Sequence, residues 1–321
     1  MATGTRTVRG LEALSLGTPP VPGQAIVRRP DNGHLATIGE ILEHQGFATY
    51  FVYGGYGYFD NMNAYFSGND YHTLDRTDFP KESVVFENIW GVVDEALFAN
   101  ALRLLDDVST DQKRFFVHIM TTSNHRPYTY PEGRIDIPSP GGRDGAVKYT
   151  DFAIGQFLDR ARQTRWFDDT LFVIVADHCA AVAGKAELPV AKYHIPLIFY
   201  GPRLVRPGRV SRLISQIDIP PTLLDVLGVE GDDHFFGKGI HEQGNIPERA
   251  FISNYQSLGY YKRNILTVLK PKRRIESYAI DPITLEAQPA PIDESLRDEA
   301  IAYYQTASRA FKLRKLKGPG Y

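Results

Sequence analysis

The chain has 321 residues, a formal net charge of −2 and 43% hydrophobic residues. This composition excludes a disordered chain, which is poor in apolar residues, and a general nucleic-acid binder, which carries a strongly basic face. The single cysteine excludes an internal disulfide and a cysteine-rich metal site. No apolar run reaches the roughly 18 residues of a transmembrane helix, and the N-terminus lacks the apolar core of a secretory signal.

Helical and extended patterns alternate along the first half of the chain. Apolar spacing and flanking breakers predict, in order, a helix over 7–16, a helix over 35–44, a strand over 48–53, a helix over 94–105, a strand over 115–120, a helix over 144–162 and a strand over 171–176. The segment YGYFDNMNAYFSGNDYH (56–72) is aromatic and rich in amides, which predicts a binding loop.

The second half adds strands over 195–200, 251–254, 265–270 and 274–280 and helices over 219–227 and 295–313. The last two strands predict a hairpin around Pro271 and Lys272. The alternation predicts an α/β fold with a mostly parallel central sheet, helices on both faces, and a small C-terminal β-hairpin and helix. Ligand sites in such sheets gather at the carboxyl ends of the strands.

Asp177 and His178 directly follow the apolar run 171–176, at the predicted end of a buried strand. An Asp oxygen and a His nitrogen suit Zn²⁺ or Mn²⁺, and neighbours can share one ion once the alternation of the strand is broken. The alternative is that Asp177 caps the following turn and His178 is an ordinary buried histidine. Both interpretations stay open from these residues alone.

The segment GTRTVRGLEAL (4–14) predicts a helix that begins at Thr5 or Thr7. A helix N-terminus presents free N–H groups and the positive end of the helix dipole, which favour a phosphate. A hydroxyl there, beside Arg6 and a metal, can become an alkoxide nucleophile. The alternative is a threonine that only caps the helix, which is the commonest use of such a residue.

Two more polar segments are candidates for substrate binding. TTSNHRPYTYP (121–131) places His125 just past a strand, where an imidazole can bind a phosphoryl oxygen or protonate a leaving group. KAELPVAKYHIPLIFYGP (185–202) places Lys185 and His194 between two strands, and His194 can face the same cleft. The alternatives are that His125 is a loop histidine without a role, and that Lys185 and Lys192 are a solvated pair of lysines.

Five motifs occur in one order, GTRTVRGLEAL, YGGYGYFDNMNAYF, TTSNHRPYTYP, IVADHCA…AGK…LPVAKYHIPLIFYGP and SQIDIPPTLLDVLG. Together they closely resemble the extracytoplasmic catalytic domain of the lipoteichoic acid synthase family, which are phosphoglycerol transferases of the alkaline phosphatase and sulfatase superfamily. The resemblance spans residues 3–255 of the 321. Several separate motifs in one order make it specific.

The resemblance implies a metal centre and a nucleophile. The family holds one divalent ion, usually Mn²⁺ (Mg²⁺ and Zn²⁺ are alternatives), through a Glu, the nucleophilic Thr, an Asp and a His. Thr7, Asp177 and His178 match the last three. Arg6 matches the basic residue before the nucleophile, and His125 matches the histidine that contacts the substrate phosphate.

The resemblance also implies the reaction. Thr7 would attack the phosphorus of phosphatidylglycerol or a similar phospholipid, diacylglycerol would leave, and a phosphoglycerol-threonine intermediate would pass its group to a hydroxyl acceptor such as a glycan or glycolipid. Some relatives carry Trp and Arg as phosphate contacts in the loop where this chain has Asp60 and Asn63. These two residues are therefore candidate substrate contacts, and the acceptor or head group is expected to differ.

The sequence departs from the family pattern ahead of Thr7. Only six residues precede it, so the strand and the Glu ligand that the resemblance places upstream are absent from the sequence, as are the membrane helices. The simplest interpretation is that Met1 is an internal methionine, and that the chain is a fragment or mis-started frame of a longer membrane enzyme. We then expect weak or no turnover from the 321 residues alone.

These expectations give residues 1–255 as a sulfatase-like catalytic domain lacking its first strand, with residues 256–321 as a hairpin and helix packed on it. The family location is the extracytoplasmic face of the cell membrane, although the chain carries no targeting signal. An aldehyde-type sulfatase is disfavoured, since Cys179 is not followed by x-P-x-R. A hydrolase of sulfuric esters or phosphodiesters, or an inactive remnant, is the alternative.

Overall fold

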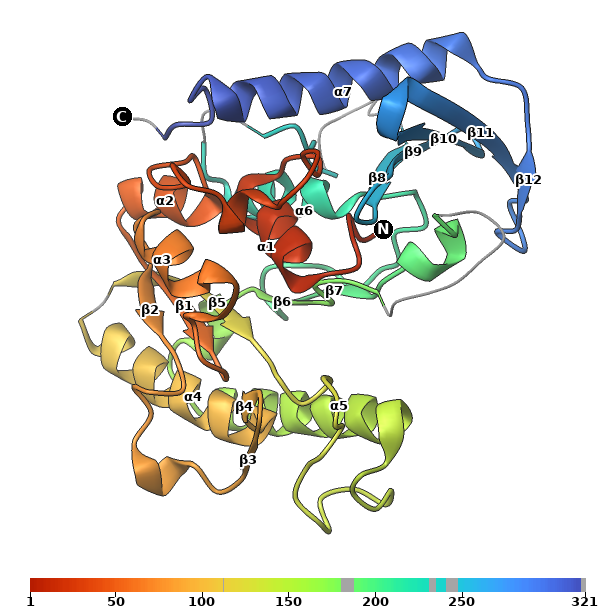
Figure 1. Cartoon of the computed structure of the whole chain (residues 1–321). Coiled ribbons are helices and arrows are strands. Elements are labelled where there is room, and N and C mark those ends of the chain that lie inside the picture. The colour runs from red at the N-terminus through yellow and green to blue at the C-terminus, as the bar shows by residue number, and fades with distance from the viewer. Residues whose placement is uncertain (112, 180–187, 231–234, 241–247, 319–321) are drawn as a thin grey trace. The chain divides into compact units, whose positions relative to one another are not determined.

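The computed structural model describes residues 1–111, 113–179, 188–230, 235–240 and 248–318. The chain divides into two compact units, which are described separately (Figure 1). Unit 1 comprises Met1–Ile41 and Leu171–Tyr321, and unit 2 comprises Leu42–Thr170.

Unit 2 is built on a parallel sheet with the strand order β2-β1-β5. Its strands are β1 (Phe47–Tyr53), β2 (His72–Leu74) and β5 (Arg114–Met120). Tyr53 lies opposite Met120, so β1 and β5 end at the same edge of the sheet. The loops that carry Asp60 and His125 therefore leave from one edge, as expected for a site at the carboxyl ends of parallel strands.

Helices cover this sheet. The remaining elements of unit 2 are α3 (Met62–Ser67), β3 (Glu87–Asn88), β4 (Gly91–Val92), α4 (Asp94–Thr110), α5 (Gly142–Ala161) and the short 3-10 helices η2 (Phe59–Asn61), η3 (Lys81–Ser83) and η4 (Phe167–Asp169). The helix α4 packs on β1, β5 and α5. The predicted helices and strands of this unit are confirmed, with ends shifted by a few residues.

The predicted binding loop 56–72 differs, because it contains the helix α3. Met62, Tyr65 and Phe66 are buried, at the i, i+3, i+4 spacing of one helix face. Phe66 stacks on Phe51 of β1 at a centroid distance of 3.8 Å, so aromatic packing on the sheet overrides the turn-forming amides.

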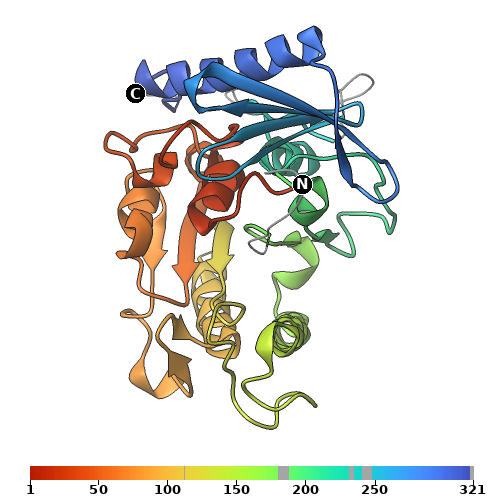
Figure 2. The same ribbon diagram turned by 45° about the vertical axis from the view of Figure 1, so that its right-hand side comes forward.

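Unit 1 contains a five-stranded antiparallel sheet with the order β12-β11-β10-β9-β8. Its strands are β8 (Arg249–Ser253), β9 (Leu258–Lys262), β10 (Ile265–Lys270), β11 (Arg274–Ile280) and β12 (Ala287–Pro289). The predicted hairpin of β10 and β11 is confirmed, and the sheet around it is larger than predicted. The helix α7 (Glu294–Lys312) lies across it (Figures 1 and 2).

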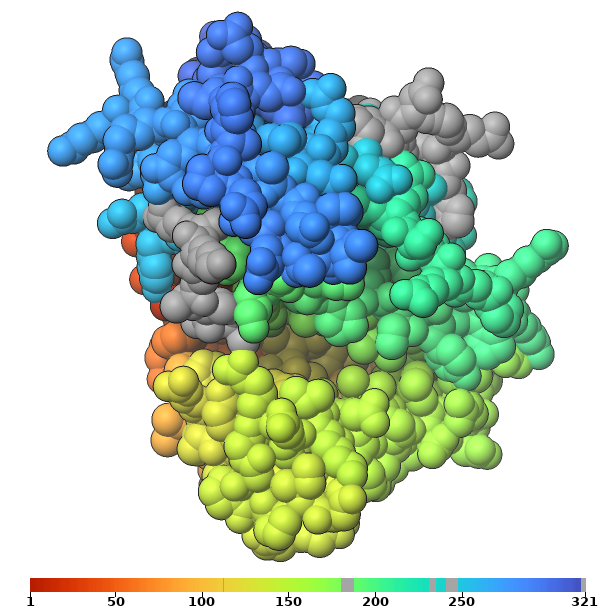
Figure 3. All heavy atoms as spheres, turned by 90° about the vertical axis from the view of Figure 1, so that its right-hand side faces the viewer, coloured from red at the N-terminus to blue at the C-terminus, as the bar shows by residue number. Residues whose placement is uncertain are grey.

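Both faces of this sheet are covered, which explains its apolar strands. Phe251 and Tyr260 face a cluster that includes Tyr304 of α7, whereas Ile252 and Leu266 face a second buried cluster. Residue 255, the predicted boundary of the catalytic domain, lies between the paired strands β8 and β9. Sheet and α7 form the blue surface in Figure 3.

The other elements of unit 1 carry the predicted nucleophile and metal ligands. They are α1 (Thr7–Leu16), η1 (Ile26–Arg28), β6 (Phe172–Val175), η5 (Val190–Tyr193), β7 (Leu197–Tyr200), η6 (Gln216–Asp218) and α6 (Ile219–Leu227), while α2 (Ile38–His44) spans the division between the units. The bounds of α1 and α6 are those predicted. None of the helices in the described ranges is both long and apolar enough to cross a bilayer.

The strand β6 differs in detail from the prediction. It pairs with β7 antiparallel, whereas β2, β1 and β5 of unit 2 pair in parallel. All four residues of β6 are half-buried instead of fully buried. Pairing with β7 on one side leaves this strand less covered than its apolar sequence indicates.

A buried ion pair fastens β8 to the segment that starts α6. The Arg249 guanidinium donates to both carboxylate oxygens of Asp218 at 3.0 Å, and Arg249 is only 1% exposed. Asp218 also accepts from the backbone N–H groups of Ser215 and Lys238. A charge held this way is costly to leave without its partner.

We expect Arg249→Met to destabilise unit 1 by about 3–5 kcal/mol, because the Asp218 carboxylate would stay buried without its cation. Urea unfolding followed by circular dichroism measures this. The matched control is Arg297→Met on α7, where the guanidinium pairs with Asp298 on the surface and its loss should leave the midpoint unchanged. Equal losses in the two variants would contradict the prediction.

Candidate active site

Thr7 is the first residue of α1 and is half-buried. Arg6 precedes it in an extended conformation, and its carbonyl accepts from the N–H groups of Arg9 and Gly10. No side chain in the described part of the chain caps this helix, and its first turn contains no acid. The N-terminus of α1 therefore keeps the positive end of its dipole available to an anion.

The helix α1 packs directly on the backbone that follows β6. A Cβ atom on Gly10 would lie 2.1 Å from the carbonyl oxygen of Asp177, which is far inside a van der Waals contact. Cys179 lies just beyond, with its Sγ 3.9 Å from the carbonyl oxygen of Gly4. The segments around Thr7 and Asp177, far apart in sequence, thus meet in one packed junction.

Gln216 holds this junction together. Its Nε2 donates to the carbonyl oxygens of Ala176 (3.1 Å) and Asp177 (2.9 Å). Its Oε1 accepts from the backbone N–H of Thr3 at 3.0 Å and from the Thr3 hydroxyl at 3.2 Å. One buried amide therefore fixes the approach to α1 and the end of β6 to the same side chain. Sequence analysis missed Gln216, because a glutamine in a loop gives no signal of burial.

Asp177 and His178 lie side by side just past the end of β6. His178 Nδ1 lies 2.6 Å from the carbonyl oxygen of Cys179, and since a carbonyl only accepts, this nitrogen carries the proton. The lone pair is then on Nε2, which lies 3.6 Å from Asp177 Oδ2. A backbone carbonyl that orients the imidazole in this way is a common support of metal-binding histidines.

The donor set fits a divalent cation. A carboxylate and a neutral imidazole at this separation suit Mn²⁺ or Zn²⁺, and both side chains are partly exposed. Across the described residues, no group of three or more His, Cys, Asp or Glu is placed to hold a metal. A third ligand from these residues would have to be of another type.

Three other predicted residues belong to unit 1. The Arg6 guanidinium donates to the Tyr255 hydroxyl and lies 5.5 Å from the centre of that ring, a contact that sequence analysis missed. His194 is exposed, directly after η5. Lys185 lies outside the described residues.

His125 lies in unit 2, on the exposed loop after β5. Its ring packs against Trp90 in a tilted arrangement, with a centroid distance of 3.7 Å and an interplanar angle of 39°. Trp90 sits in the turn of the β3–β4 hairpin, and Phe59 meets it edge-on at 5.6 Å. The sequence analysis did not select Trp90, although a tryptophan in a hairpin turn beside Gly91 is a usable signal.

A buried carboxylate fixes the backbone just before His125. Asp94, the first residue of α4, accepts from the N–H groups of Thr122 and Ser123, both at 3.1 Å, and from the hydroxyl of Thr150 on α5 at 2.6 Å. Burial raises the pKa of Asp94 above its ordinary value, against the opposing effect of these hydrogen bonds. The carboxylate thus positions the loop that carries the predicted phosphate contact.

The two remaining candidates differ in environment. Asn63 is half-buried, and its Nδ2 donates to Asp75 Oδ2 at 2.9 Å. The same carboxylate oxygen accepts from the backbone N–H of Gly57 at 2.8 Å. Burial raises the pKa of Asp75, but its hydrogen bonds, first among them those from Thr77, outweigh this and leave it below its ordinary value. Asp60 is half-buried and has a left-handed backbone, with a φ of 51°. The role of Asp60 in substrate binding stays a prediction.

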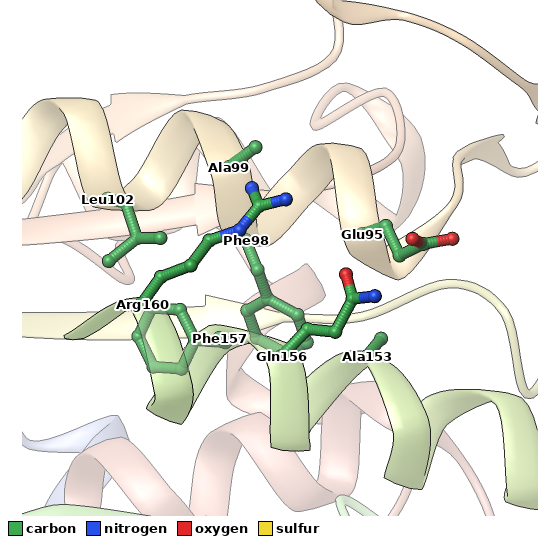
Figure 4. A pocket seen from close by; sticks show the side chains of 8 residues that line it. All are labelled: Glu95, Phe98, Ala99, Leu102, Ala153, Gln156, Phe157 and Arg160. Carbon is green, nitrogen blue, oxygen red and sulfur yellow. The ribbon is translucent and has the colours of Figure 1, made fainter. Parts of the chain in front are cut away.

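A shallow crevice of about 180 Å³ lies between α4 and α5, apart from these residues (Figure 4). It is lined by Glu95, Phe98, Ala99, Leu102, Ala153, Gln156, Phe157 and Arg160. None of the predicted site residues is among them, so we assign it no role.

An α/β fold with polar loops at the carboxyl edge of a parallel sheet, together with a helix that begins at a threonine and packs through Gly10 on the backbone of Asp177, is typical of enzymes that transfer or hydrolyse phosphoryl or sulfuryl groups. The family model "Sulfatase" matches residues 1–229. The chain belongs to the sulfatase family, within the alkaline phosphatase superfamily.

Relatives of known sequence or structure agree with this assignment. A protein in the alkaline phosphatase superfamily from Vibrio parahaemolyticus is 36% identical, with a TM-score of 0.93 over 99% of this chain and 78% of that one. The lipoteichoic acid synthase LtaP from Listeria monocytogenes shares the fold at 18% identity, with a TM-score of 0.79 over 99% of this chain and 82% of that one.

Phosphoglycerol transferase I of Escherichia coli (strain 55989 / EAEC) is 24% identical over 294 residues, which is 86% of this chain. The chain spans 38% of the length of that relative. The resemblance to the lipoteichoic acid synthase family, stated from the motifs, is confirmed by these matches.

The packing of Gly10 can be tested by adding one methyl group. We expect Gly10→Ala to destabilise the protein by at least about 2 kcal/mol, because the new Cβ would overlap the Asp177 carbonyl and force α1 away from it. The matched control is Gly155→Ala within α5, where a Cβ meets nothing within 4 Å. That variant should gain about 0.5–1 kcal/mol from helix propensity. Thermal unfolding compares the two, and a stable Gly10→Ala protein would refute the close approach.

The environment of Asp94 predicts a pH dependence. Since its folded pKa lies above the ordinary 3.8, the folded state binds the proton more tightly than the unfolded state. The carboxyl therefore contributes most at low pH, and its contribution is lost as the pH rises from 3.8 through the folded pKa. Asp94→Asn keeps the acceptor and can donate to Thr150, so its stability relative to the parent should increase between pH 4 and pH 7.

Asp94→Ala serves as the second variant of this series. It leaves the Thr122 and Ser123 N–H groups without their acceptor, and we expect a loss of about 2–4 kcal/mol at pH 7. Urea unfolding at several pH values measures both variants. An Asn variant whose advantage shrinks as the pH rises would contradict the assignment of the raised pKa.

Proposed function

We propose that the chain is the catalytic domain of a metal-dependent phosphoglycerol transferase with Thr7 as its nucleophile. The observation that supports this most is the junction in unit 1. Thr7 begins α1, and Gly10 of the same helix lies against the backbone of Asp177. A hydroxyl, an anion-favouring helix end and an Asp–His pair are thereby brought onto one packed unit.

The proposal assigns Thr7, Asp177 and His178 as ligands of one divalent cation, with Mn²⁺ as our choice. When bound, such an ion supplies positive charge that favours the deprotonated hydroxyl and the negative oxygens of a phosphate. The chain itself contributes the N–H groups of the first turn of α1, which face an anion with no reorganisation. Arg6, at the same helix end, adds a fixed positive charge.

In the proposed reaction, the Thr7 hydroxyl loses its proton to water as its oxygen forms a bond to the phosphorus of a phosphatidylglycerol-like lipid. The bond from phosphorus to the diacylglycerol oxygen breaks, and that oxygen takes a proton from water as diacylglycerol leaves. The oxygen of a glycan or glycolipid hydroxyl then loses its proton and bonds to the phosphorus, the bond from phosphorus to the Thr7 oxygen breaks, and that oxygen regains a proton. We assign His125 to a phosphoryl oxygen or to the leaving group by family resemblance, and Asp60, Asn63, Lys185 and His194 to the substrate.

The Escherichia coli relative is named a phosphoglycerol transferase, which favours transfer over hydrolysis in this proposal. We also propose that the reaction takes place at the extracytoplasmic face of the cell membrane, as the family resemblance implies. Cys179 is buried, and burial raises the pKa of its thiol, so the environment of this side chain disfavours a role as a modified sulfatase nucleophile. A hydrolase of the same superfamily would use water in place of the hydroxyl acceptor.

The nucleophile can be tested by trapping the covalent intermediate. We expect the chain, loaded with Mn²⁺ and given phosphatidylglycerol in detergent, to carry a phosphoglycerol group on the peptide that contains Thr7. Peptide mass spectrometry detects this adduct even when turnover is weak. Thr7→Ala should abolish the adduct and lower transfer at least about a thousandfold.

Thr5→Ala is the control, since it removes the same side chain two residues earlier. It should keep the adduct, whereas chelation of the metal should prevent its formation. Full lipid turnover by Thr7→Ala would overturn the assignment. Release of free phosphoglycerol in place of transfer to a glycan acceptor would favour the hydrolase.

A further inference from the structure

We propose that an apolar rim of unit 2, consisting of Tyr58, Phe59, Ile89 and Trp90, contacts the surface of an anionic lipid bilayer. The choice of a bilayer rests on the proposed function, since the donor of that reaction is a phospholipid. The binding itself is a property of this surface and can be measured without turnover.

The rim exposes large apolar side chains where a soluble surface normally has polar ones. Ile89 is 79% exposed and Tyr58 is 81% exposed, while Phe59 is 43% exposed. Ile89 sits in the turn between β3 and β4, so it projects from the tip of a hairpin. Exposed apolar side chains gathered on one surface mark an interaction site more often than scattered ones do.

The rim is rigidly attached to the loop of His125. Phe59 meets Trp90 edge-on at 5.6 Å, and Trp90 packs against His125 at 3.7 Å. Asn88, beside the hairpin turn, donates to the hydroxyl of Thr129 at 3.1 Å. Whatever the rim touches is therefore held next to the loop that is assigned to the substrate phosphate.

The charges around the rim suit an anionic surface. Arg126 follows His125 on the exposed loop, and Arg143 donates to Tyr128 at 3.3 Å. Glu87, the acid of the hairpin, is paired with Arg76 at 2.5 Å. Basic side chains beside an apolar surface are the pattern of proteins that lie on anionic bilayers.

The side chains favour lipid over a sugar. Glycan sites offer the flat face of an aromatic ring to the sugar. The ring of Trp90 already packs against His125, and Phe59 meets the same ring edge-on, so Trp90 is poorly placed for a sugar. The most projecting aliphatic group is the branched Ile89, which suits hydrocarbon. The exposed Tyr58 beside it is of a residue type that prefers the depth of the lipid head groups.

The two tryptophans of the chain allow a direct test. Trp166 is 6% exposed and donates to Asp106, so Trp166→Phe leaves Trp90 as the single reporter. We expect vesicles of phosphatidylcholine and phosphatidylglycerol to shift Trp90 emission to the blue, and brominated acyl chains to quench it. Unchanged emission, with no co-sedimentation of the unmutated chain with the vesicles, would overturn the proposal.

Ile89→Asp tests the rim without touching the predicted site. We expect its partitioning onto these vesicles to fall about tenfold. The control is Ile283→Asp, which adds the same charge at a side chain that is 90% exposed in unit 1, and it should bind as the parent does. An equal loss of vesicle binding in both variants would mean that overall charge drives binding, and it would contradict a bilayer contact through the rim.

Two further outcomes separate this proposal from the proposed function. Vesicle-dependent quenching of Trp90 without any adduct on Thr7 would support bilayer binding by the rim and contradict the proposed transferase activity. An adduct from detergent-dispersed lipid without vesicle binding would support the transferase activity and contradict bilayer binding by the rim. A blue shift with a soluble oligosaccharide, and none with vesicles, would overturn the rim in favour of a glycan site.

Discussion

The hydrogen bonds of the Gln216 side chain are the constraint on which the candidate site of unit 1 depends. Its amide joins Thr3, which leads into α1, to the carbonyls of Ala176 and Asp177 at the end of β6. Segments more than 170 residues apart in the sequence are thereby fixed to one side chain. The amide is buried, and each bond lost would leave a backbone group without its partner in a dry environment, so the arrangement has few alternatives.

Unit 2 also has a buried side chain that holds the backbone near a candidate site residue, and here it is a carboxylate. Asp94 holds the N–H groups of Thr122 and Ser123, three and two residues before His125, and reaches α5 through Thr150. In both units a fully buried polar group lies beneath a partly exposed candidate side chain. Because buried polar groups must be satisfied, they specify a loop conformation more sharply than apolar packing does.

The sequence predicted the elements whose pattern is local. The helices α1 and α6 have the predicted bounds, because a threonine before an apolar stripe and a Pro-Pro first turn are local start signals. The helix α3 was missed, since its aromatic residues gain their helical preference from packing on β1. Gln216 and Asp94 could not be found either, because their roles arise from partners that lie 39 and 28 residues or more away.

In the candidate site of unit 1, the side chains assigned to chemistry are partly exposed, whereas the groups that hold the backbone beneath them are buried. Thr7, Asp177 and His178 are only half-buried, so a substrate or an ion can reach them. The backbone that carries Asp177 is held by groups that solvent does not reach, namely the Gln216 amide and the bare backbone of Gly10. Catalysis by fixed charges and dipoles requires that they do not reorganise during the reaction. A rigid buried layer beneath reachable side chains meets this requirement.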